Sequence, residues 1–331
     1  MKKIIWRLAL AGVTAGTSMI ALADTTVAEL TLGQGVRMDD LNWNIGLKPT
    51  PNVLSELTWR DLEINQTQTG FTLHNQKVLF KGEFRYGQIE EGENQDSDYL
   101  GDNRTDEFIR SYSKTAGETV DGSFAMGYRL TTPTARFTST VTPLIGFAKH
   151  KQYLQMIEGR RTLNARIPDP APVPLNGLNS SYDTEWQSLW LGIDASLHVT
   201  SNAVLSLTFA HYPDLKYRAV ADWNLATRFQ HPVSFTHYAR GNGNHFALSA
   251  SYRLIDQLKA ALTFTYDRMR ARNGTDTTYL SPQYDNEVVQ ISLNGVNWQS
   301  SAIMLTLTWS ATVRSAAKSG IDSKERPLLV E

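Results

Sequence analysis

The sequence has no cysteine in its 331 residues, which excludes a disulfide-stapled scaffold and any thiolate metal site. It also lacks a basic excess, because its formal net charge is −1, whereas a surface that binds nucleic acid needs a marked one. We therefore expect no nucleic-acid partner and no cofactor. We also expect no metal site, because the histidines lack the short paired spacing of a metal motif. The histidines in question are His211, His231, His237 and His245.

No apolar run after Asp24 is long enough for a membrane-spanning helix. The residues before it follow the secretory pattern, with an apolar run over 8–20 and small residues at both specificity positions of 21–23. A basic region precedes the run at Lys2, Lys3 and Arg7. This pattern predicts that residues 1–23 are a cleaved signal peptide. The mature chain is then either soluble beyond the inner membrane or a transmembrane barrel.

Period-two alternation over segments of about ten residues favours the barrel, whose strands present one face to lipid and the other to the lumen. In residues 77–86, Phe80 and Phe84 share one face while Lys81 and Glu83 share the other. We predict that the lipid-facing residues include Phe80, Phe84, Leu191, Phe264 and Leu305. We predict that charged residues face the lumen, pair across it and fill it: Lys81, Glu83, Arg85, Arg129, Asp194 and Asp267.

The connections between alternating segments are short and long in turn. Residues 131–134, 200–202 and 255–257 read as tight turns, whereas 89–118, 157–181, 223–243 and 273–286 are long. Barrels with short periplasmic turns and long external loops show this order. A soluble β-sandwich also alternates, with its apolar face inward, and it stays as the alternative at this point.

We therefore predict an all-β fold, a ten-stranded antiparallel transmembrane β-barrel with short periplasmic turns and long extracellular loops, in the bacterial cell outer membrane. The barrel is expected to span 24–311, and the charged segment 312–331 to be a disordered tail. The predicted strands are 29–38, 54–64, 77–88, 119–130, 135–156, 182–199, 203–222, 244–254, 258–271 and 287–310.

Two motifs in this arrangement resemble those of the omptins, a family of ten-stranded outer-membrane proteases. The run from Ser55 to Trp59 resembles the Ser-x-Leu-x-Trp of the second omptin strand. The segment 95–99 is similar to the Asp-x-Asp-aromatic motif that holds the family's paired active-site aspartates. The resemblance implies that Asp96 and Asp98 are catalytic and lie in the second external loop. A solvated acidic loop is the alternative.

The family also uses an Asp-x-His dyad across the cleft, and here the sequence departs from the pattern. Asp222 matches the aspartate, but Asn224 stands where the histidine is expected. Asparagine cannot accept a proton, so catalysis would need His231 as a replacement base, or one proton shared by Asp96 and Asp98.

Three hypotheses follow from the sequence. The first is a surface aspartic-type endopeptidase that acts on peptides or proteins through Asp96, Asp98, Asp222 and His231. The second is a non-catalytic barrel for envelope integrity, adhesion or limited permeation, similar to the Protochlamydia-type members of the omptin-like superfamily. A soluble periplasmic binding or lectin-like protein is the third. A histidine close to the aspartate pair would separate the first two.

The strand expected over 135–156 ends its apolar face with Lys149 and Lys151. One interpretation is that these lysines simply keep a part of the wall that extends beyond the bilayer soluble in water. The alternative is that they bind membrane lipid, because cations one repeat apart on a strand suit neighbouring anionic headgroups. The resemblance to omptins, which bind lipopolysaccharide on the equivalent wall, implies that the lipid is lipopolysaccharide.

Overall fold

The computed structural model describes residues 25–47, 49–134, 137–166 and 172–314. Its helices are two short 3-10 turns, η1 (Asp102–Arg104) and η2 (Pro282–Tyr284). Within these residues no helix is long and apolar enough to cross a membrane. The strands are β1 (Thr25–Gly46), β2 (Ser55–His74), β3 (Val78–Tyr99), β4 (Glu107–Tyr128), β5 (Leu130–Pro133), β6 (Thr138–Asn164), β7 (Val173–His198), β8 (Ala203–Asp222), β9 (Phe235–Ile255), β10 (Leu258–Tyr279) and β11 (Val288–Arg314).

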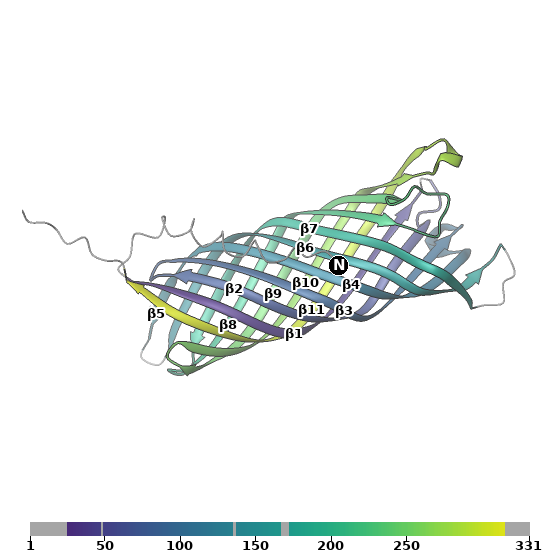
Figure 1. Cartoon of the computed structure of the whole chain (residues 1–331). Helices are drawn as coiled ribbons and strands as arrows, with labels where there is room; N and C mark the ends of the chain where they lie inside the picture. Colours follow the sequence, from purple (N-terminus) through teal and green to yellow (C-terminus); the bar gives the residue numbers. More distant parts are fainter. Residues whose placement is uncertain (1–24, 48, 135–136, 167–171, 315–331) are drawn as a thin grey trace, which may run out of the picture.

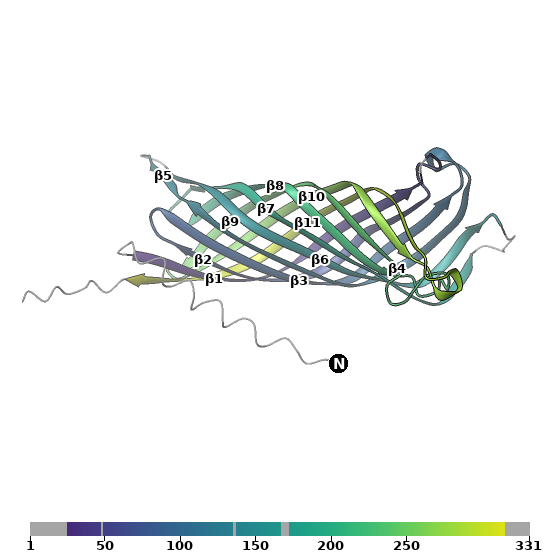
Figure 2. The ribbon, with the colours of Figure 1, turned by 90° about the horizontal axis from the view of Figure 1, so that it is seen from above.

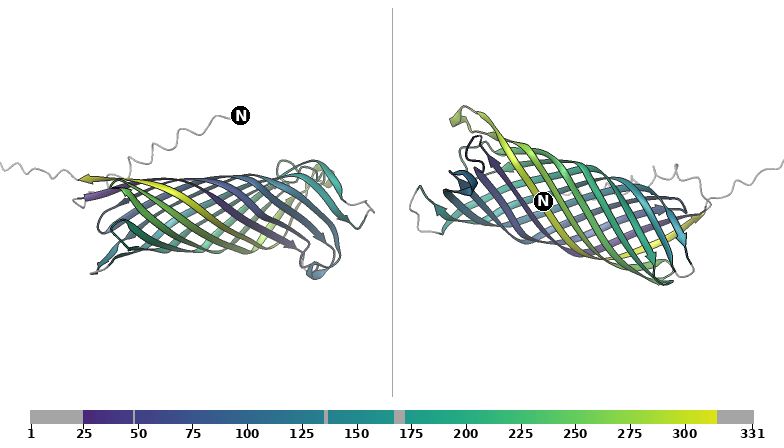
Figure 3. Two further views of the ribbon diagram at one scale, coloured as in Figure 1. Left: turned by 90° about the horizontal axis from the view of Figure 1, so that it is seen from below. Right: turned by 180° about the vertical axis from the view of Figure 1, so that it is seen from behind.

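The strands form one antiparallel sheet that closes on itself. β1 pairs with both β2 and β11, and β4 pairs with β6, which completes the ring. Tilted strands run the length of an elongated barrel in Figure 1, and Figure 3 shows the same wall from two further sides. Closure pairs the backbone groups that an open sheet would leave exposed along its edges. The predicted all-β, antiparallel barrel is confirmed at this level.

The structure has eleven strands where the sequence predicted ten. β4 and β5 are separated only by Arg129, and both pair with β6. The Arg129 guanidinium donates to the carbonyl oxygen of Asn75 at 2.6 Å and lies 2.6 Å from His74 Nδ1. The interruption therefore occurs where Arg129 binds the turn between β2 and β3.

The two ends of the barrel differ, as Figure 2 shows. We call the end that carries Thr25 and Arg314 the terminal end, and the opposite one the loop end. Strands extend further toward the loop end than predicted: β3 and β4 continue into the segment 89–118 that was expected to be a loop. Asp96 and Asp98 consequently lie in β3. Alternation gave no signal there, because both faces of this extension carry polar residues.

The termini also differ from the prediction where the structure describes them. β11 continues through Arg314, so residues 312–314, expected in the tail, belong to the barrel wall. The predicted signal peptide and the rest of the predicted tail, 315–331, lie outside the described residues.

The outer face carries a continuous belt of exposed large apolar side chains. The belt contains four of the five residues predicted to face lipid: Phe84, Leu191, Phe264 and Leu305. The fifth, Phe80, is half-buried and so less exposed than the others. The belt includes Leu30, Leu32, Val36, Met38, Phe71, Phe84, Tyr86, Phe124, Met126, Ile145, Leu189, Leu191, Leu207, Phe209, Leu248, Leu262, Phe264, Tyr266, Ile303, Leu305 and Trp309. An apolar belt that encircles the ring is what a hydrocarbon surrounding requires.

Aromatic rings fill the lumen toward the loop end. Trp59 of β2 stacks on Tyr182 of β7 at a ring-centroid distance of 5.0 Å, and Trp186 of β7 lies 6.3 Å from Trp298 of β11. Opposite walls of the ring thus touch through their side chains. The fully buried members of this aromatic core are Trp59, Trp186, Trp298, Tyr182 and Tyr217.

A buried ion cluster lies beneath the aromatic core. Arg37 Nη2 is 2.5 Å from Asp39 Oδ2, and Arg37 Nη1 is 2.6 Å from Asp121 Oδ2. Asp39 also accepts hydrogen bonds from Gln152 and Trp298, both at 2.9 Å. The cluster therefore connects β1 to β4, β6 and β11 through the interior, so the lumen is closed by side chains at this level.

Candidate functional site

The two aspartates of the Asp-x-Asp motif project into the mouth of the barrel at the loop end. In the register between β2 and β3, Asp96 is opposite Leu57 and Asp98 is opposite Ser55. Directly opposed residues share a face of the sheet, and Leu57 is fully buried inside the ring. The two motifs noted in the sequence therefore form one unit, with the side chain of Ser55 hydrogen-bonded to Asp98.

The aspartates are half-buried, and their environment disfavours two negative charges. Burial raises the pKa of Asp96 well above its usual value, and the neighbouring Asp98 raises it further. Burial also raises the pKa of Asp98, although the hydrogen bond from Ser55 and the charge of Arg228 lower it. A pair of this kind holds its first proton more tightly than an isolated carboxylate does.

Trp223 and Arg228 face the aspartate pair from the connection between β8 and β9. Hydrogen bonding by the Trp223 side chain lowers the pKa of Asp96, the charge of Arg228 lowers the pKa of both carboxylates, and the charge of Arg166 lowers that of Asp98. The Trp223 ring packs on Phe235, with ring centroids 4.7 Å apart. The groups that act on the carboxylates from this connection are thus an indole and a guanidinium.

Asp222 and His231 form a pair of their own. His231 Nδ1 lies 2.6 Å from Asp222 Oδ1, which joins two residues that the sequence offered only as separate candidates. Ala219 and Ala221 are buried inside the ring, so alternation turns Asp222 toward the outer face of β8. Among the described residues, the contacts of Asp96 and Asp98 include no imidazole.

A second polar chain, which sequence reasoning missed, lies buried below the mouth. His237 Nε2 is 2.9 Å from Asp276 Oδ2, its Nδ1 is 2.8 Å from the Tyr182 hydroxyl, and that hydroxyl is 2.5 Å from the Tyr217 hydroxyl. The four residues come from β10, β9, β7 and β8, so no spacing in the sequence could have indicated the chain. All four are closed off from solvent, which makes the chain part of the core.

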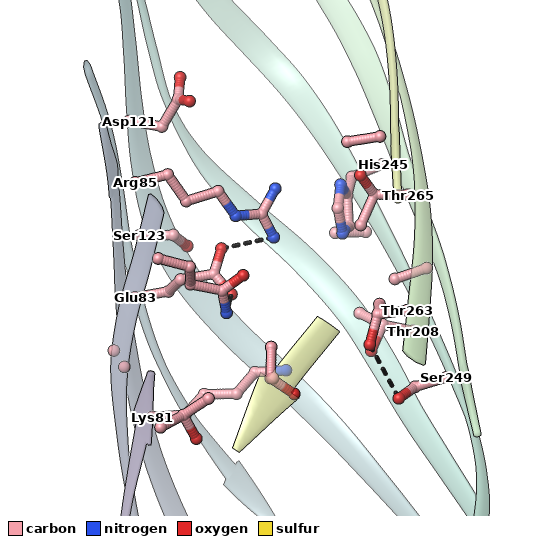
Figure 4. Close-up of a pocket in the computed structure, with 18 of the residues that line it drawn as sticks. Lys81, Glu83, Arg85, Asp121, Ser123, Thr208, His245, Ser249, Thr263 and Thr265 are labelled. Carbon is pink, nitrogen blue, oxygen red and sulfur yellow. Dashed lines mark hydrogen bonds and ion pairs between the residues drawn. The ribbon is translucent and has the colours of Figure 1, made fainter. Parts of the chain in front are cut away.

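The lumen opens into a cavity of about 340 Å³ on the terminal side of the ion cluster. In Figure 4, Lys81, Glu83 and Arg85 project from one wall toward Thr263, Thr265 and His245. Lys81 pairs with Asp194 across the lumen at 2.6 Å, as predicted, and Arg85 pairs with Glu83 at 2.6 Å. Asp267 pairs instead with His245 on the neighbouring strand at 2.8 Å. These residues line a cavity rather than fill it; the closure comes from Arg37 and the aromatic core.

Lys149 and Lys151 lie on the outer face of β6. Their Nζ atoms are 2.9 and 3.4 Å from Glu185 Oε2 on β7, and Lys151 also donates to the Tyr153 hydroxyl at 3.4 Å. Asp183 of β7, opposite Tyr153, lies on the same outer face as Glu185, so two lysines and two carboxylates meet at the edge of the apolar belt. The described residues include no group of three or more metal-ligating side chains that could hold an ion.

The sequence matches a known family of proteins over most of its length. The model of the family described as Protochlamydia outer membrane protein matches residues 31–311. The chain belongs to this family. A search of curated proteins gave no match.

Among solved structures, the outer membrane protease OmpT from Escherichia coli superposes with a TM-score of 0.71 at 11% identity, covering 87% of this chain and 97% of that one. The translocator domain of the autotransporter NalP from Neisseria meningitidis gives a TM-score of 0.35 at 9% identity, covering 89% and 91%. The OmpT match shows a shared omptin-like fold. Together with the family it places the protein in the bacterial outer membrane; in barrels of this kind the short turns face the periplasm.

Proposed function

We propose that this protein is a closed, non-proteolytic barrel that serves the integrity of the outer membrane. The observation that carries the proposal is the surroundings of Asp96 and Asp98. A proteolytic water needs a base that titrates near the working pH. The side chains that act on the pair from other connections are Trp223, Arg228 and Arg166, and none of them can accept a proton there. His231 is engaged with Asp222 instead.

The closed lumen supports a structural role over permeation. The aromatic core and the Arg37 cluster bring opposite walls into contact through buried side chains. Purified protein in planar bilayers should therefore show no steady conductance steps. Porin-like steps in the wild-type protein would contradict the closed lumen and favour limited permeation.

A second candidate is an aspartic-type endopeptidase that needs no histidine. The half-buried Asp96 and Asp98 lie two residues apart at the mouth of the barrel, and the raised pKa of Asp96 favours one proton shared by the pair. Such a dyad could activate water as the carboxylates of aspartic proteases do. Peptidase activity would then fall as the pH rises through the pKa of Asp96, because the pair loses its shared proton.

The two candidates differ in a peptide-cleavage assay. We expect no cleavage of a peptide library by the refolded wild-type barrel, with the products analysed by mass spectrometry. If cleavage does occur, Asp96→Asn and Asp98→Asn should each remove most of it, while Asp285→Asn, an exposed loop control, should not. His231→Ala then shows whether the Asp222 pair contributes a base. Activity that survives in the Asp96→Asn, Asp98→Asn double variant would belong to another site or to a contaminant.

We also propose that Lys149 and Lys151 bind phosphate groups of lipopolysaccharide. They lie beside the half-buried Phe147 at the edge of the apolar belt, at the depth where lipid headgroups meet the wall. The Lys149→Gln, Lys151→Gln double variant should retain several-fold less lipopolysaccharide after purification and should unfold at a lower temperature when refolded with it. The matched control is Lys77→Gln, Lys114→Gln, which removes the same charge elsewhere. Equal lipid retention in both double variants would mean that Lys149 and Lys151 do not bind lipopolysaccharide and only make the wall soluble in water.

A further inference from the structure

The outer wall carries a basic face just beyond the apolar belt on β8, β9 and β10. On β10, for example, the exposed Phe264 and Tyr266 are followed on the same face by Arg268, Arg270 and Arg272. Within the described part of the chain, the one ion pair of this face joins Arg240 to Asp214 at 3.9 Å. The cations of the basic face are Lys216, Arg218, Arg240, Arg268, Arg270 and Arg272.

An acidic face of the same size lies on β1 to β4. Glu90 follows Tyr86 beyond the belt on β3, and Asp40 follows Met38 on β1. The cation Arg60 is exposed among these carboxylates. Within the described parts of residues 25–314, no carboxylate of the acidic face forms an ion pair. The carboxylates of the acidic face are Asp40, Asp61, Glu63, Glu90, Glu91 and Glu118.

The two faces lie at a similar height on the barrel. Asp40 is opposite Gln299 of β11, which is opposite Arg268 of β10. Because barrel strands are tilted by about 35–45°, residues at one height shift by about one residue per strand relative to this register. The shift brings Arg270 and Arg240 close to the level of Asp40. Acidic and basic halves thus form one charged belt, divided by sign.

Because the negative and positive charges lie on separate faces, different partners would neutralise the belt to different extents. Anionic lipid headgroups would neutralise the basic face and would be repelled by the acidic face. A second copy of the chain neutralises both, because each copy offers the face that the other lacks. We propose that copies of this protein associate side by side in the membrane, with the acidic face of β1–β4 against the basic face of β8–β10.

The contact is heterologous, since two different surfaces meet. The acidic and basic strands are separated by β11 on one side of the ring and by β6 and β7 on the other, so the faces lie on nearly opposite walls. After pairing, each copy keeps one free face, so the pair still offers one face of each sign. Such contacts propagate into rows rather than stopping at a dimer.

Site-directed cross-linking tests the arrangement cleanly because the chain contains no cysteine. Glu63→Cys and Arg240→Cys are purified singly, refolded in phosphatidylcholine vesicles without anionic lipid, and oxidised. We expect a dimer band when the two variants are mixed and little in either variant alone. The chain that carries both substitutions should give a ladder of higher species. Dimers from Glu63→Cys alone would overturn the head-to-tail contact.

Charge exchange separates association from misfolding. An Arg218→Glu, Arg240→Glu, Arg270→Glu variant and an Asp40→Lys, Glu63→Lys, Glu90→Lys variant should each stay dispersed, whereas their mixture should associate as the wild type does. Salt of about 1 M, where the Debye length is about 3 Å, should disperse the wild type. The proposal is wrong if both variants associate as strongly as the wild type. It is also wrong if the substitutions change only the retention of lipopolysaccharide, which would mean that the basic face binds lipid.

Discussion

Replacement of Arg37 by Met should lower the free energy of unfolding by about 3–5 kcal/mol, the usual cost of leaving a buried charge without its partner. Arg37 is the cation between Asp39 and Asp121, and the three side chains are almost completely buried. Gln152, Trp298 and His150 would still contact the carboxylates, but none of them is a permanent cation. Urea unfolding of the refolded barrel, followed by tryptophan fluorescence, gives the value.

A triple variant shows whether the loss is electrostatic. Arg37→Met combined with Asp39→Asn and Asp121→Asn removes all three charges, and it should recover most of the stability lost in the single variant. Stability of Arg37→Met equal to wild type would mean that water reaches the cluster and that the lumen is open at this level.

Trp186→Ala should also destabilise the barrel by about 3–5 kcal/mol, as large aromatic truncations in cores do. Trp186 is fully buried, and its ring lies 4.3 Å from Tyr217 and 6.3 Å from Trp298 between ring centroids. Its indole Nε1 has no hydrogen-bond partner among the described residues, so the loss reports packing alone.

The matched control is Trp309→Ala, because Trp309 is 54% exposed on the outer belt. Lipid replaces much of the surface that this ring covers, so its removal should cost far less. The same unfolding assay compares the two variants. Equal losses would show that the aromatic core does not hold the walls together.

The wall of the barrel could be predicted from the sequence because lipid imposes a pattern on it. Phe264 and Leu305 must face hydrocarbon, whereas the residues next to them in the sequence face the lumen. Each strand that crosses the membrane therefore alternates between apolar and other residues. Beyond the belt both faces of a strand meet water or polar side chains, and the pattern fades. For that reason the sequence predicts a loop around Asp96, where β3 continues, and gives no sign of the break at Arg129.

The site could be predicted only in part. Asp96 and Asp98 can be found from a local motif, because residues two positions apart lie on the same face of a strand. Trp223 and Arg228, which decide what those carboxylates can do, come from a distant connection whose course no local rule gives. The same holds for the ion cluster, in which Arg37 and Asp121 meet across 84 residues.

The pairing of β1 with β11 governs how the barrel can be assembled. Thr31 and Thr308 share a hydrogen bond although 277 residues separate them, and contacts of such separation form late because the intervening chain must first be ordered. Until β11 arrives, β1 and the last completed strand expose open edges that can pair with other chains. A nascent or truncated chain is therefore a hazard for aggregation, and its release into the bilayer as a finished unit depends on synthesis of its final strand.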